Sequence, residues 1–267
     1  MCRHLAYLGP PVSVRDLLYA PPHALEHQAY AARLCHHGPL NADGFGVGWY
    51  APGRAEPVRY RRSMPMWADA SFAEVASVVT AECLVAAVRS ATVGFPVEES
   101  GAQPFVAGHR MLSHNGRIEG FAGIEARLRA RAVEALGDDP AAVPDARAPL
   151  DSAPLLALAV GYWRGGAGLG EGLAEVVAEV AELAGARLNL LAADGAALAA
   201  TAYGDSLFVR DDRPDGGPAV LASEPYDDAP SWRRVPDRSL VQVDAAGVTI
   251  TQLKENRACR SSGSTAT

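Results

Sequence analysis

The chain has 267 residues, of which 49% are hydrophobic, and it carries a formal net charge of −7. This length suits one large domain, and the acidic balance excludes a nucleic-acid binder, because neutralising phosphates requires a basic face. No run approaches the roughly 18 apolar residues of a membrane helix, and Arg3 and His4 interrupt the N-terminal apolar stretch, unlike in a secretory signal. The lack of a disulfide framework favours free thiols in the reducing cytoplasm. The four cysteines are Cys2, Cys35, Cys83 and Cys259.

Apolar strands and short helices share the first half of the chain. The patterns predict strands at 4–8, 41–50, 57–63, 83–92 and 110–118, and helices at 12–21 and 69–81, the latter capped by Asp69 or Ser71. The strands at 83–92 and 110–118 both run into polar residues. In the stretch 110–118 these polar residues predict an Asn–Gly turn.

Helices fill the middle of the chain and strands close it. The expected helices are 123–136, 152–163 and 171–185, and the expected strands are 186–194, 197–204, 206–210, 219–225, 239–244 and 247–253. This order predicts an α+β fold with two packed sheets and outer helices, rather than alternating βαβ units. We expect one domain over residues 1–253 and a disordered tail over residues 254–267.

Cys2 raises a chemical question, because loss of Met1 would make it the N-terminal residue. A thiol attacks as thiolate, and an ordinary cysteine pKa near 8.5 leaves little thiolate at neutral pH. An α-amino group has a pKa of roughly 7.7–8.0 and would act as a base on the same residue. By position alone, a small apolar residue at the start of a strand explains Cys2 equally well.

Three short polar motifs follow apolar strands or precede a helix. Arg89 and Thr92 in "RSAT" suit a carboxylate, although a surface salt bridge is the simpler explanation. Asn115 and Gly116 in "SHNG" suit an oxyanion hole, although an ordinary turn has the same sequence. Asp151 in "LDSA" suits a substrate ammonium group, and its position also predicts a helix N-cap.

Two further motifs give weaker indications. The glycines of "NADGFGVG" lack the spacing and the lysine of a phosphate loop, so we interpret them as closely packed backbone beside a site, in a turn ordered by Asn41 and Asp43. The cysteine and two histidines of "CHH", residues 35–37, are adjacent in the sequence, whereas the ligands of a zinc site are separated by two or more residues. His109 and His114 have no partner that the sequence reveals. We expect neither a metal nor another cofactor.

Cys2, "RSAT", "SHNG" and "LDSA" occur together in one order, and this combination resembles the class II glutamine amidotransferases, which are N-terminal-nucleophile hydrolases. The resemblance implies a four-layer αββα sandwich. It also implies that Cys2 is the nucleophile, with its own α-amino group as the base, and that Asn115 and Gly116 form the oxyanion hole. Arg89 and Thr92 would hold the α-carboxylate of a γ-glutamyl group, and Asp151 its α-amino group. The chain departs from the larger members at Ser90 and Val93.

Longer stretches, including "MCRHLAYLGPP", "LNADGFGVGWY" and "ARLNLLAADG", resemble the amidohydrolase family of ergothioneine biosynthesis in actinobacteria over residues 1–253. That resemblance implies hydrolysis of γ-glutamyl-hercynylcysteine S-oxide to glutamate and hercynylcysteine S-oxide. The leaving group carries a quaternary ammonium, which favours aromatic faces and carboxylates. The candidates for that end are Trp67, Tyr226, Asp227 and Asp228, although the aromatic residues also suit a core and the two aspartates a solvated surface.

Three alternatives remain open. One is a glutaminase subunit that delivers ammonia to a separate synthase. The second is a metal or redox protein built on Cys2, His4, Cys35, His36 and His37. The third is an inactive module that binds γ-glutamyl groups. The favoured interpretation is a cytoplasmic hydrolase with a small-molecule substrate, no nucleic-acid or membrane partner and no obligate synthase partner. A homodimer is compatible with it.

Overall fold

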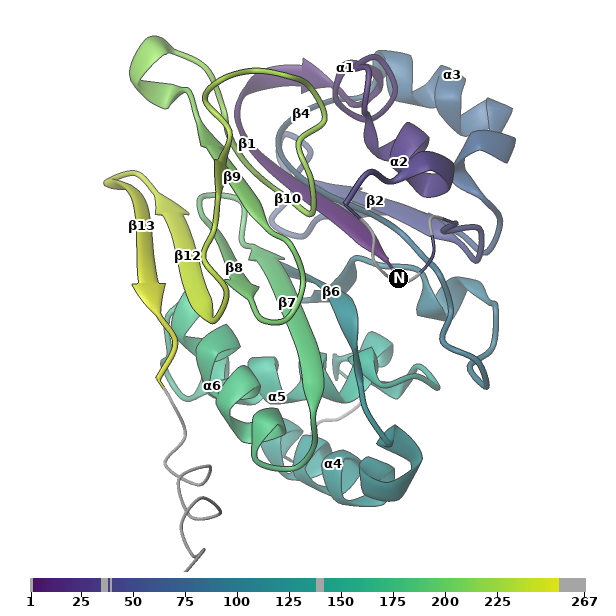
Figure 1. The fold of residues 1–267 in the computed structure, drawn as a ribbon, viewed down its shortest axis with the longest axis vertical. Helices are drawn as coiled ribbons and strands as arrows, with labels where there is room; N and C mark the ends of the chain where they lie inside the picture. Colours follow the sequence, from purple (N-terminus) through teal and green to yellow (C-terminus); the bar gives the residue numbers. More distant parts are fainter. Residues whose placement is uncertain (1, 35–37, 39, 138–141, 255–267) are drawn as a thin grey trace, which may run out of the picture.

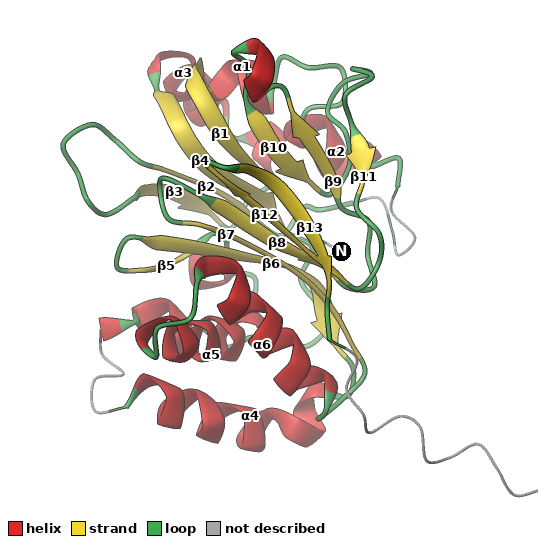
Figure 2. Cartoon of the chain, turned by 90° about the vertical axis from the view of Figure 1, so that its left-hand side faces the viewer, coloured by secondary structure: helices red, strands yellow, loops and turns green. Residues whose placement is uncertain are grey.

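The computed structural model describes residues 2–34, 38, 40–137 and 142–254. Two antiparallel sheets pack face to face, and helices cover the outer face of each sheet (Figures 1 and 2). The order of layers is helix, sheet, sheet, helix, which confirms the predicted α+β sandwich.

The first sheet, called sheet A, has seven strands in the order β11-β9-β10-β1-β4-β2-β3. The strands of sheet A are β1 Arg3–Ser13, β2 Phe45–Trp49, β3 Val58–Arg62, β4 Thr80–Val88, β9 Phe208–Asp211, β10 Ala219–Ala222 and β11 Arg233–Arg234. β1 lies in the middle, between β4 and β10, with Arg3 opposite Val88 and Leu5 opposite Ala222. Cys2, the residue before β1, is therefore held at the end of a central strand.

The second sheet, called sheet B, has six strands in the order β13-β12-β8-β7-β6-β5. The strands of sheet B are β5 Phe105–Ala107, β6 Arg110–Ile118, β7 Ala186–Ala193, β8 Leu198–Ala202, β12 Ser239–Asp244 and β13 Gly247–Gln252. The "SHNG" motif is not a turn: β6 continues through it and pairs with β7, with Asn115 opposite Asn189. The predicted Asn–Gly turn is therefore wrong, because pairing along β7 outweighs the local turn preference.

Among the described residues, each outer layer contains three α-helices. Sheet A is covered by α1 Val14–Leu18, α2 Leu25–Ala31 and α3 Ala70–Val78, and sheet B by α4 Phe121–Leu136, α5 Ser152–Arg164 and α6 Leu169–Ala181. Asp69 caps α3, since its carboxylate accepts the Phe72 N–H at 2.9 Å, as predicted. The sequence patterns did not predict α2, whose N-cap residue Ala24 makes no side-chain capping bond.

Many of the side chains between the sheets are apolar, for example Ala6 and Val85 from sheet A and Leu191 and Ala193 from sheet B. The glycines of β2 allow close packing at one edge: a Cβ at Gly46 would collide with the Gln103 main-chain oxygen. This confirms that the glycine-dense segment is packed backbone. Three apolar clusters thus connect the four layers, which makes the scaffold around the strand ends rigid.

Several expectations fall on residues outside the described ranges. These are the removal of Met1, the ligand set of Cys35, His36 and His37, the thiol of Cys259, and the tail beyond Lys254. They stay predictions, as does the assignment of residues 1–253 to one domain.

Candidate functional site

Cys2 lies directly before β1, at the end of sheet A where β4 ends and β2 begins. Its Sγ lies 3.9 Å from the main-chain oxygen of Ser90, and the residue is partly exposed. Removal from water raises the pKa of the Cys2 thiol, the positive charge of Arg89 lowers it, and Asp151 raises it. Both charges therefore lie close enough to act on the thiol. Because the net effect favours the neutral thiol, a base must take its proton before it attacks.

Arg89 follows β4 and is only 5% exposed. Its guanidinium donates to the main-chain oxygens of Asp43 at 3.4 Å and Pro96 at 3.0 Å. It packs against Gly101, where a Cβ would lie 2.8 Å from Cζ. These contacts use only part of its five N–H groups, so a positioned guanidinium remains able to bind a carboxylate.

The loop after Arg89 is held by the turn that precedes β2. The Asp43 carboxylate accepts the Ala91 N–H at 2.8 Å, as expected for a residue that orders this turn. Thr92 is partly exposed in the same loop, and its main-chain oxygen accepts the Phe95 N–H at 3.0 Å. Thr92 thus lies three residues after Arg89 in the chain, on the loop that the Asp43 carboxylate holds.

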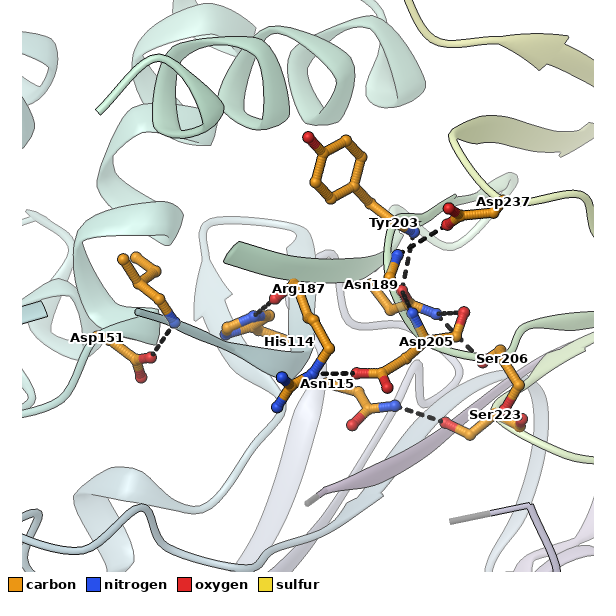
Figure 3. Close-up of polar contacts among 12 residues, drawn as sticks. His114, Asn115, Asp151, Arg187, Asn189, Tyr203, Asp205, Ser206, Ser223 and Asp237 are labelled. Carbon is orange, nitrogen blue, oxygen red and sulfur yellow. Dashed lines mark hydrogen bonds and ion pairs between the residues drawn. The ribbon is translucent and has the colours of Figure 1, made fainter. Parts of the chain in front are cut away.

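Asn115 is fully buried on β6, and its side chain connects the two sheets. Its Nδ2 donates to Ser223 Oγ at 3.4 Å, and the same hydroxyl oxygen accepts the His4 main-chain N–H at 3.0 Å (Figure 3). Ser223 therefore anchors the Asn115 amide and the start of the Cys2 strand together. Since Nδ2 carries two protons, one remains for an oxyanion.

Gly116 occupies a position that only glycine fits. A Cβ there would overlap the Arg187 carbonyl oxygen on β7, and it would lie 2.6 Å from the carbonyl carbon and 2.7 Å from His114 Nε2. The backbone at the candidate oxyanion hole is thus in direct contact with the neighbouring strand.

Asp151 occupies the N-cap position of α5 and is 5% exposed, but its side chain makes no capping bond with the helix. Its Oδ2 instead accepts the main-chain N–H of Ile118 at 3.1 Å (Figure 3). The predicted side-chain cap is wrong, because β6 supplies the donor. That bond fixes the carboxylate beside the oxyanion residues, which lie on the same strand.

The proton positions around Asp151 follow from its neighbours. His114 Nε2 lies 3.0 Å from the Arg187 carbonyl oxygen, which can only accept, so Nε2 carries the proton. His114 Nδ1 lies 2.8 Å from the Ser152 hydroxyl, and that hydroxyl lies 3.4 Å from Asp151 Oδ1, to which it can donate. Because a carboxylate oxygen accepts more than one hydrogen bond, Asp151 Oδ1 can also accept from a cationic group.

His4 is buried between the sheets and stays neutral. Its Nδ1 lies 3.2 Å from Ser113 Oγ, which donates its own proton to Gln103 Oε1 at 2.9 Å. Burial, together with His114 and Arg3, lowers the pKa of His4 to about 3. His4 is therefore a positioning group of the Cys2 strand rather than a proton carrier at neutral pH.

Acidification from pH 6.5 to pH 5 is expected to cost the fold about 2 kcal/mol through His4. Its pKa is lowered by folding, so the unfolded chain binds more protons in this range, and stability falls as the pH falls. His4→Gln should remove this part of the slope. Denaturant unfolding of both proteins at pH 7, 6 and 5 measures it, and equal slopes for the two proteins would refute the assignment.

The four residues suggested for a cationic leaving group differ in their surroundings. Trp67 is 39% exposed and meets Tyr30 edge-on, with ring centroids 5.5 Å apart. Asp228 is exposed, and its Oδ1 lies 3.8 Å from His23 Nε2. Tyr226 is 7% exposed in the core under the α1–α3 layer, which is the core alternative named above.

Asp227 already has strong partners. Its Oδ2 pairs with Arg210 at 2.8 Å, and its Oδ1 accepts the Trp232 Nε1–H at 2.7 Å. The structure therefore leaves Trp67 and Asp228 open to solvent, while Asp227 and Tyr226 hold the loop that carries Asp228.

Sequence reasoning missed Ser223 and the partners of His114. Ser223 lies 108 residues from Asn115, and its only local signal is that it ends an apolar strand. His114 is 1% exposed and bonded at both ring nitrogens, whereas the sequence showed no partner for it.

Within the described ranges, no three His, Cys, Asp or Glu side chains form a group that could hold a metal ion. Across those same ranges, no helix combines the length and the hydropathy that crossing a bilayer requires.

Known proteins resemble the chain over almost its whole length, although no family model matches it. It is 45% identical to the gamma-glutamyl-hercynylcysteine sulfoxide hydrolase of Mycolicibacterium smegmatis over 254 residues, 95% of this chain and 100% of the relative. The protein of the same name from Mycobacterium tuberculosis (strain CDC 1551 / Oshkosh) is also 45% identical, over 95% of this chain and 97% of the relative.

A solved structure agrees on the fold. The glutamine aminotransferase class-II domain protein of Silicibacter pomeroyi superposes with a TM-score of 0.67 at 23% identity, over 95% of this chain and 100% of that one. Together with the two relatives, this shows that the chain belongs to the gamma-glutamyl-hercynylcysteine sulfoxide hydrolase family, on the fold of the class II glutamine amidotransferases.

Proposed function

We propose that the protein hydrolyses the γ-glutamyl amide bond of gamma-glutamyl-hercynylcysteine sulfoxide, giving glutamate and hercynylcysteine sulfoxide. The observation that carries the proposal is the gathering of a thiol, a guanidinium, a carboxylate and a buried amide at one end of the sheets. These groups belong to Cys2, Arg89, Asp151 and Asn115, in a chain 45% identical to hydrolases of that name.

The proposed reaction has two halves that share one base. After Met1 is lost, the α-amino group of Cys2 takes the thiol proton, and the thiolate attacks the γ-carbonyl carbon. The Asn115 amide and the Gly116 N–H receive the oxyanion. The intermediate collapses to a γ-glutamyl thioester as the α-ammonium gives its proton to the leaving nitrogen. Water, deprotonated by the same amine, then cleaves the thioester and releases glutamate.

Substrate orientation rests on two opposite charges. The remaining N–H groups of Arg89, with Thr92 three residues along the same loop, suit the α-carboxylate of the γ-glutamyl group. Asp151 Oδ1 suits its α-ammonium, because its one neighbouring donor in the described residues, the Ser152 hydroxyl at 3.4 Å, leaves this carboxylate oxygen able to accept further hydrogen bonds. Both ends of the amino acid would be held, which places the γ-carbonyl at Cys2.

The proposal also covers the far end of the leaving group. A quaternary ammonium is attracted to aromatic faces and carboxylates, and Trp67 and Asp228 are the exposed candidates. Tyr226 and Asp227 would act by holding the Asp228 loop, through the core contacts and the Arg210 pair described above.

The remaining parts of the proposal concern the setting. We include a cytoplasmic location, supported by the free thiols of Cys2 and Cys83. We also include action without a synthase partner, as a monomer or a homodimer. Size-exclusion chromatography with light scattering decides the oligomeric state.

One combined experiment tests the function. Intact mass spectrometry of the purified protein should show the loss of Met1, and a glutamine-analogue electrophile should add one adduct at Cys2. Glutamate release should be much faster from gamma-glutamyl-hercynylcysteine sulfoxide than from glutamine. Faster release from glutamine would favour the glutaminase alternative, and active enzyme that retains Met1 would rule out the proposed base.

Asn115→Ala is expected to lower kcat by about 10²–10³-fold, the usual effect of removing one oxyanion donor. KM should change little, because the amide contributes mainly in the transition state. Steady-state kinetics of glutamate release measures both constants. A fall in kcat/KM caused by KM alone would show that Asn115 only binds substrate.

A further inference from the structure

Arg187 is a cationic side chain beside the candidate oxyanion hole to which the proposed mechanism gives no role. It lies on β7, two residues before Asn189, which pairs with Asn115 on β6. Side chains of paired residues, and of residues two apart in a strand, share one face of a sheet. Arg187 and Asn115 therefore face the same side, and Figure 3 shows the two side chains with the dashed contact between Arg187 and Asp205.

The Arg187 side chain is held in place by contacts with Asp205 and Gly204. Its Nε donates to Asp205 Oδ2 at 3.2 Å, and the Asp205 side chain is only 5% exposed. Its stem packs on Gly204, where a Cβ would lie 2.8 Å from Arg187 Cγ. Neither terminal nitrogen of this guanidinium has a hydrogen-bond partner among the residues that the structure describes. A pair of N–H groups is thus presented with fixed direction, the arrangement that binds carboxylates.

A cavity of about 400 Å³ lies behind Arg187, bordered by its supporting residues Gly204 and Asp205 and by residues 234–237. The Arg187 side chain is itself 17% exposed, so a ligand can reach its terminal nitrogens.

The proposed substrate carries a carboxylate that needs such a partner. In a γ-glutamyl-cysteine unit the cysteine nitrogen is the scissile nitrogen, and the cysteine carboxylate is attached to the adjacent carbon. The oxyanion and the leaving nitrogen are bound to the same tetrahedral carbon, so groups next to the oxyanion hole are also close to this carboxylate. Glutamine has no such group, and Arg89 is already assigned to the γ-glutamyl carboxylate.

We propose that Arg187 binds the carboxylate of the leaving amino acid and thereby selects γ-glutamyl amino acids over glutamine. This inference rests on the proposed function and adds a specificity-determining residue to it. Asp205 and Gly204 act as positioning residues, because they reach the substrate only through Arg187.

The test compares two substrates: gamma-glutamyl-hercynylcysteine sulfoxide and its analogue in which the cysteine carboxylate is a carboxamide. Arg187→Met should lower kcat/KM about 10–100-fold on the acid, the value of a charge-assisted hydrogen-bonded contact, and less than about 3-fold on the carboxamide. Arg187→Lys should recover part of the loss on the acid. Asp205→Asn should show a smaller loss with the same selectivity for the acid.

Arg129→Met provides the matched control, since it removes the same charge from a salt bridge with Glu125 on α4, in the outer layer. It should leave both substrates unaffected. If Arg187→Met loses equal activity on the acid and the carboxamide, or loses none, while the unsubstituted enzyme is active, the proposed role of Arg187 is wrong. The proposed function itself would not be affected by that result. If the unsubstituted enzyme hydrolyses neither compound, the proposed function fails and this inference fails with it.

Discussion

Cys2→Ala is expected to reduce hydrolysis by at least about 10⁴-fold, because removal of the proposed nucleophile would leave only the contributions of binding and of the proposed oxyanion hole. Alanine is small enough to precede β1 without new contacts, and within the described residues the hydrogen bond of the Cys2 thiol is the 3.9 Å contact with the Ser90 oxygen. The substituted protein should therefore fold as before and still bind γ-glutamyl compounds. Single-turnover glutamate release and the thermal unfolding temperature are the two measurements.

Cys83 provides the control for this substitution. It is buried between the sheets at 1% exposure, and burial raises its pKa to about 12, so it carries almost no thiolate. Cys83→Ala should keep full activity and full labelling by a glutamine-analogue electrophile at Cys2. Retention of activity in Cys2→Ala, or its loss in Cys83→Ala, would assign the chemistry to another residue.

Gly116→Ala is expected to be the most disruptive single-methyl change at the site, with a loss of about 4 kcal/mol or more in unfolding free energy. The added Cβ would collide with the Arg187 carbonyl group, which belongs to the backbone of β7 and cannot rotate away. Relief would require β6 and β7 to separate, which would also displace Asn115. Urea unfolding and soluble yield measure the effect.

Gly123→Ala is the matched control for that change. Gly123 lies inside α4, and a Cβ there would have no atom within 4 Å. Alanine also has the higher helix propensity, so this variant should be equal to or slightly more stable than the original. A comparable loss in both variants would mean that glycine replacement as such, and not the contact with β7, causes the instability.

The elements of the fold could largely be predicted from the sequence where the hydrophobic period was long. α5 and α6, β1 and the closing strands all follow from local pattern. α2 was missed because it is a seven-residue helix without a capping side chain. "SHNG" was misread because Asn–Gly favours turns locally, whereas its strand structure comes from pairing with β7, a segment about 70 residues away.

The candidate site could be named from the sequence only through its combination of motifs. Cys2, Arg89 and Asp151 each had a simpler local explanation, and the structure brings their charges together. The supporting partners were invisible for a physical reason: contacts such as Asn115 with Ser223 depend on register between two sheets, which no local pattern encodes. The orientation of the His114 ring beside Ser152 likewise depends on the Arg187 carbonyl on a neighbouring strand.

The central place of β1 in sheet A has a consequence for how the protein is made. β1 pairs with β4 at residues 80–88 and with β10 at residues 219–222. A ribosome adding about 5–20 residues per second needs roughly 10–40 s to synthesise the stretch between β1 and β10. During that interval one edge of the first strand stays unpaired in the nascent chain. The predicted removal of Met1 by an aminopeptidase would therefore have a long interval before β1 is paired on both sides.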